Sequence, residues 1–172
     1  TGPVGIYVQA QRLQLDGEVT SSAGITKTGN GQLRLGANNT AMTSPVTVNR
    51  GEIAAIANSD NQFGSGDYLL NYGSIRLQSN TPRPFFDVPG QDIVVAGGFT
   101  LTSNRNGGAV AADLILGANN GSNTLTTMNG AHLRFNSESF GDDFWIESNV
   151  IVNDSAVFFN DNADLRFRGE LM

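Results

Sequence analysis

The stretch AGITKTGNGQLRL, residues 23–35, contains the two signals that decide the fold. A short turn, Gly29-Asn30-Gly31, is followed by Leu33-Arg34-Leu35, in which apolar residues recur at every second position. This alternation predicts a β-strand with one buried face. The turn lacks the third glycine of a dinucleotide-binding loop, and no helical pattern follows it. We therefore predict a corner between two strands rather than a ligand-binding loop.

The same period of two recurs along the whole chain, and no stretch has a convincing helical period. Each apolar run is short and is bounded by Gly, Asn, Asp or Ser. The composition agrees, because the 172 residues include 21 Gly and 19 Asn, which both tolerate the backbone conformations of turns. A chain with this many corners is predicted to be all-β.

Charge and composition narrow the classes of partner. The net charge is −6 and Lys27 is the single lysine beside nine arginines, so no basic stripe favours nucleic acid or anionic lipid. The absence of cysteine excludes disulfides and thiolate metal sites. No apolar run approaches the roughly 20 residues of a membrane-spanning helix, so we expect no direct membrane insertion by this segment.

A local unit, apolar-x-apolar-Asn-x-small-x-apolar, recurs with slippage at a period that drifts around 20 residues. This spacing favours one coil of a solenoid, because stacked coils pair their strand edges about 4.8 Å apart and bury one apolar face each. We expect seven or eight coils, with outward Thr, Gln, Arg and Asn. The expected second strands of the units begin at Leu13, Leu33, Ile53, Ile75, Phe99, Leu114, Leu133 and Val157.

Two pairs of similar segments, far apart in the sequence, suggest a second and longer repeat. LRLGANN (33–39) returns as LILGANN (114–120), and LQLDGEV (13–19) returns as LRFRGEL (165–171). We therefore expect residues 1–172 to be a single β-solenoid segment of a longer repetitive protein, with one long period and the start of the next.

Residues 13–53 resemble the passenger-associated transport repeat, also called the autotransporter-associated β-strand repeat. The resemblance is carried by the ordered motif Gly24-Ile25-Thr26-Lys27-Thr28-Gly29-x-Gly31-x-Leu33-x-Leu35, then by Asn39-Thr40 and by Thr47-Val48-x-x-Gly51-x-Ile53. NQFGSGDYLLNYGSIRL (61–77) is similar to the continuation, so residues 13–77 are the best match. The resemblance implies a right-handed parallel β-helix that is exported and displayed on a bacterial surface, with a role in transport and folding of a stalk.

The segment SESFGDDFWIES (137–148) is the most unusual stretch of the sequence, because it gathers acidic and aromatic residues. Its carboxylates and exposed aromatics could bind a glycan or hold Ca²⁺, although a solvated loop is the simpler interpretation. The candidate contacts are Asp142, Asp143, Phe144, Trp145 and Glu147.

The segment TPRPFFDVPG (81–90) holds three of the five prolines, which are excluded from central strands. We predict a protruding loop whose Phe85 and Phe86 either fold back on the core or contact a partner.

Three other residue sets are expected to be structural. His132 should face solvent. Lys27 is expected to be part of the repeated motif and not to act as a catalytic base. The segment that holds Asp161 and Asp164 lacks the sequence motif of a calcium-binding β-roll.

The resulting hypothesis is a structural and adhesive module of a secreted or cell-surface fibre, without catalysis or cofactor. Its partners would be neighbouring coils of the same chain, copies of itself end to end, or surface glycans and cells. Two alternatives stay open: a carbohydrate-binding or carbohydrate-cleaving β-helix, and a virion-associated segment of a phage tail fibre or spike.

Overall fold

The computed structural model describes residues 2–56, 62–78, 83–86, 88–104, 114–116, 122–128, 130–137, 143–153, 155–161 and 164–172. Its side-chain description leaves out residues 56, 78, 83–85, 103–104, 114–116 and 137. The strands are β1 Val4–Tyr7, β2 Arg12–Leu15, β3 Ile25–Thr28, β4 Gln32–Leu35, β5 Val46–Val48, β6 Glu52–Ile56, β7 Tyr68–Leu70, β8 Gly73–Gln78, β9 Arg83–Phe85, β10 Ile93–Val95, β11 Gly98–Asn104, β12 Leu114–Leu116, β13 Thr124–Thr127, β14 Ala131–Ser137, β15 Asp143–Ile146, β16 Asn149–Val152, β17 Ala156–Asp161 and β18 Asp164–Phe167. Within these ranges the chain forms no helix, and hence none that could cross a membrane.

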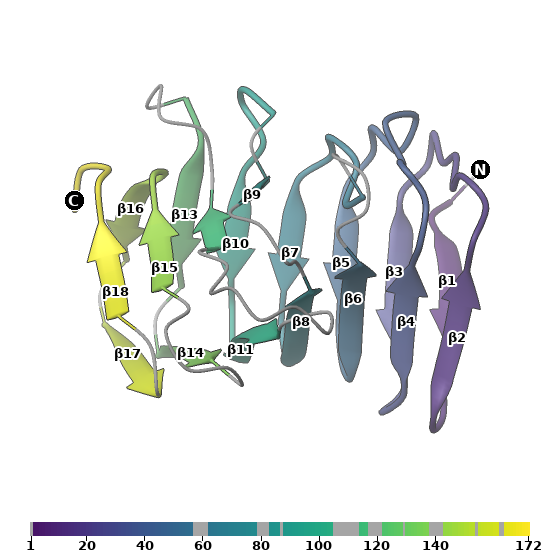
Figure 1. Cartoon of the computed structure of the whole chain (residues 1–172), viewed down its shortest axis with the longest axis horizontal. Helices are drawn as coiled ribbons and strands as arrows, with labels where there is room; N and C mark the ends of the chain where they lie inside the picture. The colour runs from purple at the N-terminus through teal and green to yellow at the C-terminus, as the bar shows by residue number, and fades with distance from the viewer. Residues whose placement is uncertain are drawn as a thin grey trace.

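The strands form three sheets in which every pairing between named strands is parallel. The first sheet has the order β1-β3-β5-β7-β10-β13-β16, and the second has the order β17-β14-β11-β8-β6-β4-β2. The third sheet, β18-β15-β12-β9, begins only in the fourth turn of the chain. The turns stack along the long axis from the N-terminus to the C-terminus (Figure 1). The predicted parallel β-helix is therefore confirmed.

The strand register gives the length of each turn. Along the second sheet one inward column runs Leu13, Leu33, Ile53, Ile75, Leu101, Phe135 and Asn160, so successive steps are 20, 20, 22, 26, 34 and 25 residues. The period of about 20 residues holds for the N-terminal turns. Later turns are longer because each adds a strand of the third sheet.

Two of the expected strand positions differ from the structure. Ile75 pairs with Leu101 rather than with Phe99, a shift of two residues within the second sheet. Leu114 begins β12 in the third sheet rather than a strand of the second. An alternating pattern identifies a strand with one buried face, but every wall of a solenoid has the same pattern. The alternating pattern therefore does not predict to which of the three sheets a strand belongs.

The two pairs of similar segments do not occupy corresponding walls. LRL of residues 33–35 lies in β4 of the second sheet, whereas LIL of residues 114–116 lies in β12 of the third sheet. LQL of residues 13–15 and LRF of residues 165–167 are divided between the same two sheets. The similar stretches are thus strands of different sheets, and they do not occupy equivalent places in the solenoid.

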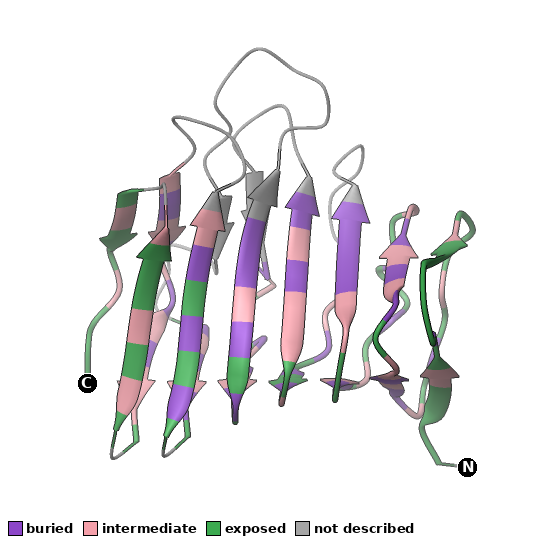
Figure 2. Cartoon of the chain, turned by 90° about the horizontal axis from the view of Figure 1, so that it is seen from below, coloured by how far each residue is buried: buried purple, intermediate pink, exposed green. Residues whose placement is uncertain are grey.

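The interior is built from the alternate side chains that face it, and Figure 2 shows the resulting bands of buried and exposed residues along the strands. Full burial of one such aliphatic or aromatic side chain stabilises the fold by about 2 kcal/mol. The largest fully buried apolar side chains are Tyr68, Phe99, Phe135, Phe144, Leu33, Leu35, Met42, Ile53, Leu70, Ile75 and Leu77.

Buried amides fix the corner that precedes the first sheet. The Asn123 Nδ2 donates to the carbonyl oxygens of Phe86, Val88 and Gln91, at 3.2, 2.7 and 2.9 Å. One turn earlier, Gln91 Nε2 donates to the carbonyls of Gly64 and Gly66. Irregular backbone inside a protein needs such partners, because an unpaired buried carbonyl is costly. The amides allow loops of different length to join the same ladders.

The proline-rich segment differs from the expected protruding loop. Residues 83–85 form β9, which is the edge strand of the third sheet and pairs only with β12. Pro84 is tolerated there because an edge strand leaves one side without ladder bonds. Phe86 is 4% exposed and stacks on Phe63, with ring centroids 5.0 Å apart. Phe86 is therefore a core residue, and of the two alternatives the one in which it folds back on the core holds. The side chain of Phe85 lies outside the described residues.

Exposed large apolar side chains are concentrated in the first and last turns. The first and second sheets end in strand edges there, at β1 and β2 and at β17. At the other end of the first sheet, Leu171 pairs with Val150 and begins a further rung. The exposed apolar residues of these turns are Val4, Tyr7, Leu13, Val157, Phe159, Phe167, Leu171 and Met172.

Candidate functional site

The acidic and aromatic segment around β15 divides between the interior and the surface. Phe144 and Ile146 point inward and are fully buried, and Phe144 packs edge-on against Phe135 with centroids 5.4 Å apart. Asp143 and Trp145 alternate with them on the outer side, and Glu147 follows. Asp142 lies outside the described residues. Phe144 is thus part of the core and is not available to a ligand.

The outer carboxylates of this segment are paired with arginines of the next rung. Arg166 Nη2 lies 3.1 Å from Asp143 Oδ2 and 3.4 Å from Asp164 Oδ2. Arg168 Nη1 lies 3.1 Å from Glu147 Oε1. These pairs join β15 to β18 across the third sheet, since Trp145 and Arg166 are in register.

The same arginines cover Trp145. The guanidinium carbon of Arg168 lies 3.4 Å from the centroid of the indole, and that of Arg166 lies 5.4 Å away. The indole Nε1 is buried and has no hydrogen-bond partner among the residues that the structure describes. A sugar-binding platform needs a free aromatic face, and Arg168 occupies one face here. The ion pairs and the arginine–indole contacts of this segment therefore stabilise the packing of two neighbouring rungs.

The described carboxylates do not converge on a metal site. Across the described ranges, no three His, Asp or Glu side chains lie close enough together to hold a metal ion. Asp161, considered from the sequence for Ca²⁺, lies 3.2 Å from Arg134 Nε through its Oδ2. His132 is exposed, as predicted, and its ring lies 6.1 Å from that of Phe159.

Lys27 is the most unusual buried group. It alternates with Ile25 on the inner side of β3 and is fully buried at the corner before β4. Its Nζ donates to the carbonyl oxygens of Thr28, Gly29 and Arg50, at 3.0, 2.8 and 2.9 Å. Burial lowers the pKa of Lys27. All three hydrogens of an ammonium group are accounted for, so Lys27 holds the corners of two rungs together.

Glycine at the next corner makes room for this lysine. Gly51 has φ +80°, in the left-handed region that favours glycine. A Cβ at this position would lie 2.8 Å from Lys27 Nζ and 2.3 Å from the carbonyl oxygen of Gly29. The segment Lys27-Thr28-Gly29 and the residue Gly51 are therefore parts of one corner.

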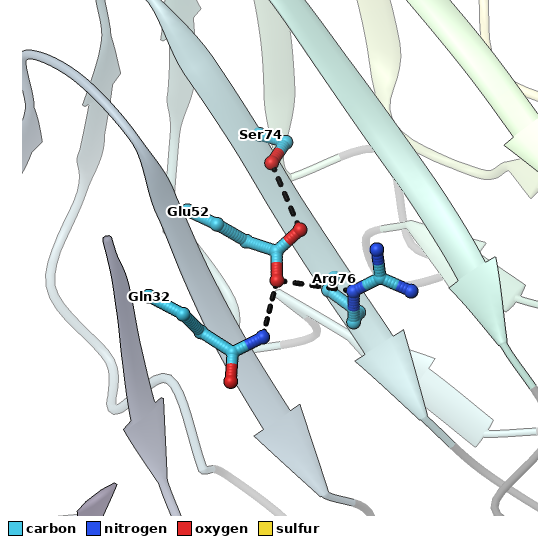
Figure 3. A network of polar contacts seen from close by, with 4 residues as sticks. All are labelled: Gln32, Glu52, Ser74 and Arg76. Atoms are coloured by element: carbon cyan, nitrogen blue, oxygen red, sulfur yellow. Dashed lines mark hydrogen bonds and ion pairs between the residues drawn. The ribbon is translucent and has the colours of Figure 1, made fainter. Parts of the chain in front are cut away.

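A carboxylate on the outer face of the second sheet was missed from the sequence. Glu52 Oε1 accepts hydrogen bonds from Gln32 Nε2 and from Arg76 Nε, the latter at 3.0 Å, and Oε2 accepts from Ser74 Oγ at 3.1 Å (Figure 3). The four residues lie on β4, β6 and β8. The sequence signal would have been their register, because Gln32, Glu52 and Ser74 occupy one outer column. Both oxygens of this carboxylate are engaged in linking three rungs.

Comparison with family models, with curated proteins and with solved structures found no match. The interpretation of the site therefore rests on its geometry.

Proposed function

We propose that this chain is a structural module, a parallel β-helical segment of an exported stalk or filament, without catalysis of its own. The observation that carries the proposal is the stacking of the strands. Seven strands of the first sheet and seven of the second pair in parallel from one rung to the next. Each rung therefore contacts only its neighbours, which is the arrangement of a solenoid whose length grows by adding rungs.

The use of the polar side chains also supports a structural role. Three ionisable side chains that could act in catalysis instead bind groups of neighbouring rungs. Lys27 donates hydrogen bonds to three carbonyl oxygens, Glu52 accepts hydrogen bonds from three donors, and Glu147 forms an ion pair with Arg168. A catalytic site keeps at least one such group available to its substrate. A solenoid held this way resists shear along its length, and further rungs add length without a larger core.

Export to a cell surface is the second part of the proposal. It rests on the resemblance of residues 13–77 to the passenger-associated transport repeat and on the cysteine-free, acidic composition. The test is protease treatment of intact cells that produce the chain, followed by mass spectrometry of the released peptides. Release from intact cells is expected, and release only after lysis would refute surface display.

A measurement on the purified protein tests the stalk itself. Small-angle scattering should give an elongated particle, and single-molecule pulling along the axis should show unfolding in steps of single turns. A trimer in solution would instead favour the phage-fibre alternative, and a mass measurement distinguishes the two.

A further inference from the structure

The outer face of the second sheet carries two adjacent arginines without a carboxylate of their own. Arg12 on β2 and Arg34 on β4 both alternate with inward leucines, and they are diagonal neighbours because Arg12 pairs with Gln32 while Gln14 pairs with Arg34. Among the described residues, no carboxylate oxygen lies within 4.0 Å of either guanidinium group. The Nε of Arg34 is buried without a hydrogen-bond partner.

The nearest acids are occupied by other groups. Glu52, on the neighbouring strand β6, accepts hydrogen bonds from Gln32, Ser74 and Arg76 (Figure 3). Asp16 Oδ1 accepts a hydrogen bond from Gln14 Nε2 at 2.6 Å. Burial and the nearby Arg12 lower the pKa of Arg34, and Asp16 only opposes this effect. Two like charges are thus held side by side, and Asp16 compensates them only in part without forming an ion pair with either.

The charge of the chain is also divided unevenly. Residues 1–56 contain four Lys or Arg and three Asp or Glu, whereas residues 57–172 contain six and thirteen. An anionic ligand is therefore repelled by most of the molecule but not by the first turns. Other arginines of the same face are neutralised, Arg76 by Glu52 and Arg134 by Asp161.

We infer that Arg12 and Arg34 form a binding site for the sulfate or carboxylate groups of an acidic polysaccharide that lies on the second sheet. Arginine suits these anions because its planar donors match two oxygens at once. On the same face, Thr100 lies in the outer column next to Ser74 and adds a neutral hydroxyl suited to sugar hydroxyls. A nucleic acid would need phosphate contacts repeated along the face, and among the described arginines of this face only Arg12 and Arg34 have no ion pair.

This inference does not depend on the proposed role as a stalk. The experiment measures binding of the purified chain to dextran sulfate by calorimetry at low and moderate salt, with neutral dextran and inorganic sulfate as separate probes. R34Q and R12Q are compared with R50Q, since Arg50 is exposed at a corner outside this face and also lacks an ion pair. Circular dichroism confirms that each variant is folded.

R34Q is expected to weaken binding of dextran sulfate about tenfold, R12Q somewhat less, and R50Q by less than about twofold, because charge-assisted contacts to a specific anion are lost only in the first two. Equal losses in R34Q and R50Q would overturn the site. So would binding of inorganic sulfate that is as tight as binding of the polymer, since the ligand would then be a free oxyanion.

Discussion

The guanidinium of Arg168 lies over Trp145, with its central carbon 3.4 Å from the centroid of the indole. The same arginine pairs with Glu147 at 3.1 Å, and its backbone N–H donates to the carbonyl of Ile146. The contact joins β18 to β15 at the last complete turn, where less apolar surface is covered than in the middle of the solenoid. A cation over an aromatic ring contributes about 1 kcal/mol at such a partly exposed site.

Substitution R168A should therefore loosen the last turn more than the rest of the molecule. Since Trp145 is the only tryptophan, its emission should shift to longer wavelength and its quenching by acrylamide should increase. The global free energy of unfolding should fall by about 1 kcal/mol. R50A is the matched control. Unchanged quenching in R168A would show that the arginine does not shield the indole in solution.

Lys27→Met should destabilise the protein although it replaces a buried cation by an apolar side chain of similar length. Three carbonyl oxygens, of Thr28, Gly29 and Arg50, lose their donor inside the corner. We expect a loss of about 3 kcal/mol in urea unfolding. Thr26→Ala, on the outer side of the same strand, should cost less than about 1 kcal/mol. A Lys27→Met variant as stable as the wild type would mean that water replaces the ammonium group.

Gly51→Ala tests the same corner from the opposite side. The new methyl group would require a residue other than glycine at φ +80° and would overlap the carbonyl oxygens of Gly29 and Gly31, at 2.3 and 2.7 Å. We expect a loss of about 3 kcal/mol or failure to accumulate as folded protein. Gly17→Ala is the control, because its added Cβ would meet no atom within 4 Å. Equal melting temperatures for the two variants would contradict the proposed packing.

Tyr68 should make the protein sensitive to alkali. Burial raises the pKa of Tyr68 well above the ordinary value of 10.0, and its hydroxyl donates to the carbonyl of Phe63 at 2.8 Å. Above about pH 10 the unfolded chain loses this proton while the folded chain keeps it. The contribution of Tyr68 to the free energy of unfolding is therefore fully present below pH 10. Above pH 10 it falls by up to about 1.4 kcal/mol for each pH unit.

Tyr68→Phe should remove this part of the pH dependence at a cost of about 1 kcal/mol at neutral pH, because the hydrogen bond is lost. Unfolding in urea at pH 8, 10 and 11 measures both effects. Tyr7→Phe serves as the control, since Tyr7 is 68% exposed. The explanation fails if the wild type and Tyr68→Phe have parallel pH profiles between pH 10 and 11.

The sequence by itself determined that the chain is a stack of short parallel strands. Alternation such as Leu33-Arg34-Leu35 specifies which side of each strand is buried, and glycine with asparagine specifies where the chain turns. These are local properties, because side-chain direction repeats every two residues and backbone freedom depends on the residue itself. For the same reason the exposure of His132 was predictable from its alternation with Leu133.

Only the tertiary structure decided to which sheet each strand belongs and which partners the polar groups have. Leu114 has the same local pattern as a strand of the second sheet, yet it begins a strand of the third. Asp143 and Glu147 looked available in the sequence, but Arg166 and Arg168 reach them from 21 to 23 positions further along the chain. Phe86 lies beside Phe63 for the same reason. Stacking brings together residues about one turn apart, and the length of each turn depends on loops that the alternating pattern does not record.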